Sequence, residues 1–255
     1  MSSPSVPGSS PAAGPCADDD AHVISRAFLQ DGGIAELLAR AAPTLRLLTD
    51  VERHDSLQAT LAKRPPGDGW VFGYGSLIWN PTIHSVERRV ARISGWHRAF
   101  CLSVQAGRGS CDNPGLVLGL DAGGECTGVA YRIAEDLLHD ELALLWRREM
   151  VVGSYIPRWV DVHDEHGTRF GSAIAFTMDA CCEQYAGHLS QRQVIQRLAT
   201  ATGVLGSAAD YLFRTCEGLR ASGMVDAELE RLAADVAAWQ SGIPPHVDTG
   251  SSGSS

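Results

Sequence analysis

Residues 70–77 read WVFGYGSL, an apolar strand pattern that runs directly into a turn with two glycines around Tyr74. Glycines at a strand end allow several backbone N–H groups to turn toward one point, and such a nest binds a carboxylate or a phosphate without a cation. The same letters are also typical of a tight turn with the Tyr74 ring packed beneath it. The turn is not a phosphate loop, because the GxxxxGK[ST] pattern is absent and no GxGxxG pattern opens a helix here. The stretch therefore predicts a strand followed by an anion cradle or a structural turn.

Helical spacing precedes this strand. Leucine and isoleucine recur at helical intervals between Leu29 and Leu61, with a break at Pro43 and an end at Pro65-Pro66. This pattern predicts two or three short helices that pack against the main body.

Strands dominate the middle of the chain. Short runs of β-branched and aromatic residues predict strands at 88–93, 98–103, 115–120 and 126–133. We expect the loop 105–114 to join the second strand to the third, and Gly123-Gly124 to form a hairpin turn before the fourth.

The second half begins with the strongest helical pattern. Residues 134–150 carry leucines and Trp146 at helical spacing, with acids in the first turn and Arg147-Arg148 in the last, as the helix dipole favours. Further strands are predicted at 158–163 and 169–178, and helices at 190–202, 208–221 and 226–239, with Ser190 and Asp226 as caps. Strands that come first and helices that come later favour an α+β domain over a doubly wound sheet.

Composition excludes several classes of protein. The 255 residues are 44% hydrophobic and 20% charged, and no apolar run reaches the roughly 18 residues that a membrane-spanning helix needs, so we expect a soluble protein. The formal net charge of −9 disfavours a nucleic-acid or anionic membrane surface, because phosphate binding depends on clustered lysine and arginine. We therefore expect no nucleic-acid partner and no membrane partner.

Cysteine usage and the N-terminus indicate the compartment. Seven cysteines form an odd set without a CxxC pair, which fits reduced thiols better than a disulfide framework or a zinc site. Residues 1–20 have neither a basic region nor an apolar core, so they do not resemble a secretory signal. We expect a cytoplasmic protein.

Glu149 is the candidate acid or base. It stands where the apolar helix pattern ends, just before the small turn that precedes Tyr155. A carboxylate near the negative end of a helix dipole and beside apolar residues has its charged form disfavoured, which raises its pKa toward a useful range. Arg147 and Arg148 would act in the opposite sense, and a surface glutamate paired with an arginine would show the same pattern.

Other reactive patterns are weaker. His163 and His166 lack a further ligand, so we expect no metal. Ser76 lacks the flanking glycines of a nucleophile elbow, and Cys181-Cys182 is typical of a buried or partly buried thiol pair. Arg108 lies in a loop that either covers a site or merely turns.

Several segments together resemble the ChaC family, in family order and near family spacing. They are VFGYGSLIWNP at 71–81, GWHRAFCL at 95–102, RG at 108–109, PGLVLGLD at 114–121, GVAY at 128–131, LWRREMVVGSY at 145–155, RWVDV at 158–162 and DYLFRT at 210–215. The resemblance covers roughly residues 25–240, including a helical lead segment like that of bacterial members. Ser154 departs from the eukaryotic members, which usually carry a second glycine there, and we expect this change to tune the pocket.

The resemblance implies the γ-glutamylcyclotransferase-like fold, an α+β structure with a compact, barrel-like mixed sheet and flanking helices. It implies a lyase that converts glutathione to 5-oxoproline and cysteinylglycine without metal or cofactor, with Glu149 as the proton acceptor. The family's γ-glutamyl-binding segment corresponds to Val71, Phe72, Gly73, Tyr74, Gly75, Ser76 and Leu77. Tyr155 could orient the substrate, and Arg108 could meet the glycyl carboxylate.

We expect a disordered tail at 1–20, a helical lead segment at 21–66, the catalytic domain at 67–242 and a flexible tail at 243–255. We expect a monomer or a weak homodimer. Two alternatives stay open: a cyclotransferase for other γ-glutamyl peptides or amines, and a non-catalytic carboxylate-binding module on the same fold.

Overall fold

The computed structural model describes residues 24–243, so the predicted tail at 1–20 and, apart from residue 243, the predicted tail at 243–255 lie outside the described residues. Three helices lead the chain: α1 (Arg26–Gln30), α2 (Gly33–Ala41) and α3 (Asp50–Leu61). They confirm the short helices predicted before Pro65. Thr49 caps α3, since its hydroxyl accepts from the Glu52 N–H while the Glu52 carboxylate accepts from the Thr49 N–H.

Five strands close into a barrel in the order β1-β3-β2-β4-β5. The strands are β1 (Gly69–Gly73), β2 (Glu87–Val104), β3 (Gly115–Ile133), β4 (Tyr155–His163) and β5 (Arg169–Met178). Neighbours are antiparallel up to β5, and a parallel pairing of β1 with β5 closes the barrel, with Trp70 opposite Ala173. The barrel confirms the predicted fold class. Both faces of β1 are buried, which explains its unbroken apolar sequence.

The predicted hairpin at Gly123-Gly124 is wrong. Residues 115–133 form one strand, and β2 likewise merges two predicted strands. The register between β2 and β3 shifts here, because Gly95 alone lies opposite Gly123 and Gly124. All three glycines have positive φ angles, of 84°, 94° and 69° respectively. They form a bulge that bends the paired strands without reversing them. The true reversal is the predicted loop 105–114.

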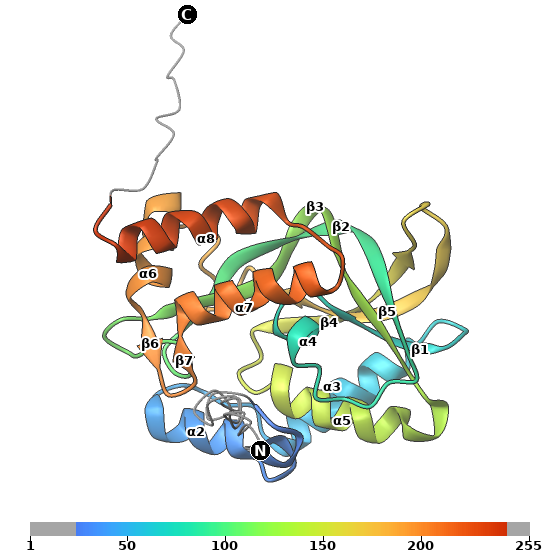
Figure 1. Ribbon diagram of the computed structural model, residues 1–255. Helices are drawn as coiled ribbons and strands as arrows, with labels where there is room; N and C mark the ends of the chain where they lie inside the picture. The colour runs from blue at the N-terminus through green and yellow to red at the C-terminus, as the bar shows by residue number, and fades with distance from the viewer. Residues whose placement is uncertain (1–23, 244–255) are drawn as a thin grey trace, which may run out of the picture.

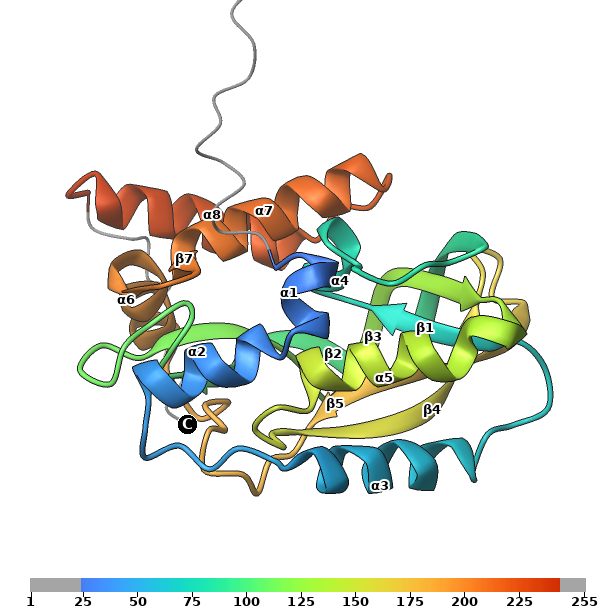
Figure 2. The same cartoon turned by 90° about the horizontal axis from the view of Figure 1, so that it is seen from below.

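Helices cover the barrel on two sides. In Figures 1 and 2, α7 (Ala208–Ala221) and α8 (Ala227–Gln240) lie along one side, whereas α2, α3 and α5 (Leu138–Glu149) lie along the other. Shorter elements are α4 (Ser76–Trp79), the 3₁₀ helix η2 (Glu135–Leu137), α6 (Gln191–Thr200), β6 (Thr202–Gly203) and β7 (Gly206–Ser207). The caps predicted at Ser190 and Asp226 are confirmed. The short helix α4 was not predicted.

The main core joins the barrel to α5 and to the C-terminal helices α6, α7 and α8. Phe72, Trp146 and Phe176 are almost fully buried, and the rings of Trp146 and Phe176 meet edge to face with centroids 5.1 Å apart. Among residues 24–243, no helix has both the length and the apolar character needed to cross a bilayer. All six cysteines in this range are free thiols.

Candidate active site

Glu149 is the last residue of α5, and the apolar face of that helix aims it inward. Leu142, Leu145 and Trp146 are buried against the barrel, and Glu149 follows them at helical intervals of seven, four and three residues. The helix stops at Met150, and the chain then turns through Gly153, whose φ of 77° suits glycine, into β4. The side chain of Glu149 is therefore only 14% exposed and lines a cavity.

Burial and a neighbouring charge act in opposite directions on Glu149. Desolvation raises the pKa of the carboxyl group, while the Arg148 guanidinium, with Nε 3.0 Å from Oε1, lowers it. The net result is a pKa above the ordinary carboxyl value. A carboxylate with a raised pKa in a cavity suits proton transfer near neutral pH.

Arg148 ties this carboxylate to the Gly-rich turn. Its Nη2 donates to Ser76 Oγ at 2.9 Å, and its Nη1 donates to the Asn80 carbonyl at 2.5 Å and to Thr82 Oγ1 at 3.1 Å. The Arg148 side chain is 4% exposed, so these bonds form away from bulk water. The arginine therefore holds Glu149 and the segment 76–82 in one fixed arrangement. The sequence alone indicated the charge of Arg148 but not its bonds to the segment 76–82.

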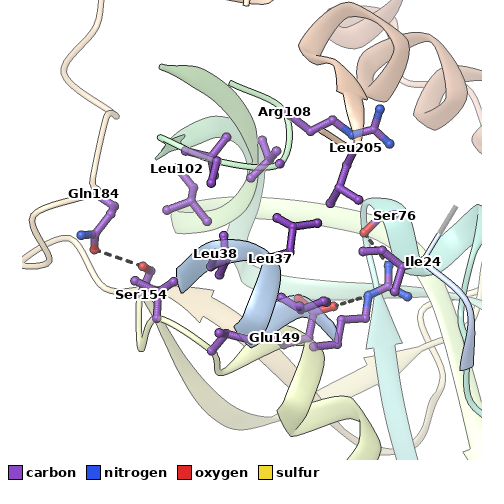
Figure 3. A pocket seen from close by; sticks show the side chains of 18 of the residues that line it. Ile24, Leu37, Leu38, Ser76, Leu102, Arg108, Glu149, Ser154, Gln184 and Leu205 are labelled. Carbon is purple, nitrogen blue, oxygen red and sulfur yellow. Dashed lines mark hydrogen bonds and ion pairs between the residues drawn. The ribbon is translucent and has the colours of Figure 1, made fainter. Parts of the chain in front are cut away.

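The cavity has a volume of about 220 Å³ and two chemically different parts. The polar part contains Ser76, Arg148, Glu149, Tyr155 and Tyr211. The apolar part comes from the lead segment, the barrel, the turn between α5 and β4 and the turn between β6 and β7, and its members are Ile24, Ile34, Leu37, Leu38, Leu45, Leu102, Val104, Val117, Val151, Val152 and Leu205. Figure 3 shows Leu37 and Leu38 of α2 beside the cavity that holds Glu149. The lead segment is thus a wall of the site.

Three buried tyrosines surround Glu149. Burial raises the pKa of Tyr74, Tyr155 and Tyr211, and the charge of Glu149 raises each further, so all three hydroxyls stay neutral. Tyr74 donates to the Phe176 carbonyl at 3.0 Å. Tyr155, which lines the cavity as the sequence suggested, donates to the Leu118 carbonyl at 3.0 Å. Tyr211 was not singled out from the sequence, although it lies in the DYLFRT segment.

The segment 71–77 divides between core and site. Val71, Phe72, Tyr74 and Leu77 are buried in the main core, and Ser76 is the member whose atoms line the cavity. The Tyr74 ring therefore packs beneath the turn, while the backbone of the turn lies beside the cavity. The packed turn is thus confirmed for the Tyr74 side chain, and the anion cradle stays a prediction for the main chain.

Arg108 lies at the far end of the cavity from Glu149 (Figure 3). Its guanidinium donates to the Ser207 carbonyl at 3.3 Å and lies 6.0 Å from the Tyr211 ring centroid. Only 8% of the residue is exposed, and burial lowers the pKa of the guanidinium. Ser154 also lines the cavity and donates to Gln184 Oε1 at 3.2 Å, a bond that a glycine could not make.

Metal ligands do not gather in this part of the chain. Among residues 24–243 there is no group of three or more histidine, cysteine, aspartate and glutamate side chains that could hold an ion. The cavity does hold a buried carboxylate, Glu149, together with Ser76 of the Gly-rich turn, and a buried carboxylate of raised pKa supports proton transfer.

Comparisons with known proteins agree with this geometry. A family model described as ChaC-like protein matches residues 69–239. A protein of Escherichia coli named glutathione-specific gamma-glutamylcyclotransferase is 41% identical over 215 residues, which cover 84% of this chain and 92% of the relative. A zebrafish protein named glutathione-specific gamma-glutamylcyclotransferase 1 is 32% identical over 157 residues, covering 60% of this chain and 80% of that relative.

A solved structure shares the fold. The yeast gamma-glutamyl cyclotransferase specific to glutathione aligns with a TM-score of 0.61 at 22% identity, covering 67% of this chain and 96% of that one. With the family match and the 41% identical relative, this leads to one conclusion: the chain belongs to the ChaC family.

Proposed function

We propose that this protein is a glutathione-specific γ-glutamylcyclotransferase, a lyase that converts glutathione to 5-oxo-L-proline and L-cysteinylglycine. The observation that carries the proposal is Glu149, buried with a raised pKa in one cavity with Ser76 of the Gly-rich turn. The E. coli relative that bears this activity in its name covers most of the chain and supports the choice of substrate.

The reaction is an internal substitution at one carbonyl carbon. The α-amine of the γ-glutamyl group attacks its own γ-carbonyl, so a carbon–nitrogen bond forms and closes a five-membered ring. The bond from that carbon to the cysteinyl nitrogen breaks, and the nitrogen leaves as an amine. Two protons move from the attacking α-ammonium to the leaving nitrogen, which becomes an ammonium, and no water, oxidant or reductant is consumed.

Glu149 is the residue that moves these protons. In its ionised form it accepts a proton from the α-ammonium, which frees the amine to attack, and it passes this proton to the leaving nitrogen; the second proton of the attacking nitrogen follows the same route as the ring forms. Since the nucleophile and the carbonyl belong to one molecule, the protein needs only to hold the folded conformer and to manage these protons. Arg148 keeps the carboxylate in place, and the neutral tyrosines around it exclude water.

The binding roles follow from the layout of the cavity. In this proposal the backbone N–H groups of Gly75, Ser76 and Leu77 hold the glutamyl α-carboxylate, as a nest of amides can. Arg108, at the other end, meets the glycyl carboxylate of the substrate. Tyr155 packs against the glutamyl chain between these two ends.

The test is the release of 5-oxoproline and cysteinylglycine from millimolar glutathione, with a chelator present. Glu149→Gln keeps the shape of the side chain but removes the base, so kcat should fall about 10²- to 10⁴-fold with a modest change in KM. Glu217→Gln alters an exposed glutamate on α7 and is the matched control. Near-wild-type activity of Glu149→Gln would refute its role.

A substrate panel separates the alternatives. Turnover of γ-glutamyl-alanine or γ-glutamyl-ε-lysine in place of glutathione would indicate a cyclotransferase of different specificity. Binding of 5-oxoproline without turnover of any γ-glutamyl compound would indicate a binding module.

We also propose that the protein works in the cytoplasm as a monomer or weak homodimer. The free cysteines support a reducing compartment, because solvent-exposed thiols such as Cys111 and Cys181 persist poorly in oxidising ones. Light scattering across a range of protein concentrations tests the oligomeric state, and fractionation of cells tests the compartment.

A further inference from the structure

Arg98 lies outside the lining of the cavity, yet it bonds to the Gly-rich turn. It stands on β2 within the GWHRAF segment, and its side chain is only 4% exposed. Nε donates to the Tyr74 carbonyl at 2.5 Å, Nη2 to the Thr127 carbonyl at 2.6 Å, and Nη1 to Asp226 Oδ2 at 2.5 Å. Each nitrogen of the guanidinium thus has an acceptor from a different part of the chain.

The bond to Tyr74 fixes the direction of the next amide. The described chain contains no cis peptide bonds, so the Tyr74 carbonyl and the Gly75 N–H point to opposite sides of one planar unit. Because the carbonyl points at Arg98, the Gly75 N–H points away from it.

Gly75 also lies close to residues of the cavity. A Cβ atom on Gly75 would lie 2.8 Å from the hydroxyl oxygen of Tyr211, a residue that lines the cavity. Gly75 therefore packs against a wall of the cavity, which Ser76 of the same turn also lines.

Asp226 holds the guanidinium in turn. Its Oδ1 accepts from the Glu228 and Leu229 N–H groups at 3.1 Å each and so caps α8, while Oδ2 takes the bond from Arg98. A carboxylate fixed at a helix N-terminus cannot follow a moving partner. The start of α8 therefore anchors Arg98, and Arg98 anchors the turn.

We infer that Arg98, held by Asp226, is a positioning residue that orients the Gly75 N–H for the substrate's α-carboxylate. The inference rests on the proposed function, since it takes that N–H as part of the carboxylate cradle. It makes the C-terminal helix α8 part of substrate binding, although no residue of α8 lines the cavity.

The test compares two substrates that differ in one group: glutathione, and 4-aminobutyryl-cysteinylglycine, which lacks the glutamyl α-carboxylate. In Arg98→Met, KM for glutathione should rise about 10- to 100-fold, as expected for a lost hydrogen bond to a charged group. The value of kcat should change by less than about threefold, because the carboxylate is remote from the bonds that change. For the analogue, kcat/KM should change little.

Further variants separate positioning from folding. Arg98→Lys keeps a donor near Tyr74 and should restore part of the affinity. Asp226→Ser keeps a helix cap but removes the partner of Arg98, so it should raise KM for glutathione selectively. The control is Arg132→Met, which removes a side chain on β3 that bonds to Glu87 on β2. It should leave the kinetics with both substrates unchanged.

A spectroscopic readout works without turnover. The Gly75 amide resonance in a ¹⁵N–¹H spectrum should move in Arg98→Met and stay in Arg132→Met. Equal losses for both substrates, a lower melting temperature with unchanged KM, or an unmoved Gly75 resonance would overturn the inference. Failure of the wild type to cleave glutathione would refute the proposed function instead, and the Gly75 resonance would still test the positioning.

Discussion

Arg148 lets the electrostatics of Glu149, the proposed base, be tested separately from its position. Its Nε lies 3.0 Å from Glu149 Oε1 and lowers the pKa of that carboxyl against the effect of burial. Replacement with methionine removes the charge and also the bonds to Ser76, Asn80 and Thr82. Replacement with lysine keeps the charge but cannot make all of these bonds. Comparison of the two variants therefore separates the effect of the Arg148 charge on the pKa of Glu149 from the effect of the Arg148 hydrogen bonds on the position of Glu149.

The magnitude follows from the lost contact. A hydrogen bond to a charged group contributes about 1.5–3 kcal/mol, which corresponds to about a 10- to 100-fold change in an equilibrium. Without Arg148 the pKa of Glu149 rises further, so the ionised form is scarcer at any pH below that pKa. In Arg148→Met, kcat/KM should therefore fall about 10- to 100-fold on the acid side and recover as the pH rises.

The assay is the pH profile of kcat/KM for glutathione in the wild type, Arg148→Met and Arg148→Lys. Groups of the substrate titrate equally in the assays of all three proteins. A shift of the acid limb of the profile therefore reports a changed pKa in the enzyme. Arg148→Lys should keep the limb near its wild-type position. Arg147→Met, an exposed neighbour on the same helix, is the control. An acid limb that stays in place in Arg148→Met, with activity lowered equally at every pH, would refute the electrostatic role.

Three further predictions concern the turn, the core and the base. Gly75→Ala places a Cβ 2.8 Å from the Tyr211 hydroxyl, so Tyr211 must move, and steady-state kinetics should show KM for glutathione at least about tenfold higher. Trp146→Ala removes a side chain that is 1% exposed, so urea unfolding should show a loss of about 3–5 kcal/mol. Burial raises the pKa of Glu149, so ionisation of this carboxyl group opposes folding once the pH rises above its ordinary pKa of 4.5. Glu149→Gln removes the ionisable group and should therefore unfold at a higher temperature than the wild type at neutral pH. The difference in melting temperature should vanish below pH 4.5.

The lead segment supplies part of the wall of the cavity that a ligand would enter. The family match begins at residue 69, and the yeast structure is covered almost completely by about two thirds of this chain. Yet Ile34, Leu37 and Leu38 line the cavity next to Glu149. Helices α1, α2 and α3 of this segment contact α5, and the sequence alone could not decide whether they reach the site.

The sequence alone determined the features that depend on neighbouring residues. Helix boundaries followed from periodicity and caps at Ser190 and Asp226, and Glu149 was identified from the end of an apolar helix and from the ChaC motifs. The sequence did not distinguish the bulge at Gly123-Gly124 from a hairpin turn, because two glycines suit a chain reversal and a bend equally well. Only pairing with the distant Gly95 decides between them.

Tertiary structure decided the features that join distant segments. Arg148 reaches Ser76 across 72 residues, and Arg98 reaches Tyr74 across 24 residues and Asp226 across 128. Tyr211 and the leucines of α2 enter the cavity from opposite ends of the chain. Local hydrophobic patterns determine which residues face inward. Which distant residue a buried side chain bonds to depends on how the barrel closes. The sequence therefore singled out Glu149 as the candidate base, while the direction of its pKa shift, its anchor and the walls around it were set by the fold.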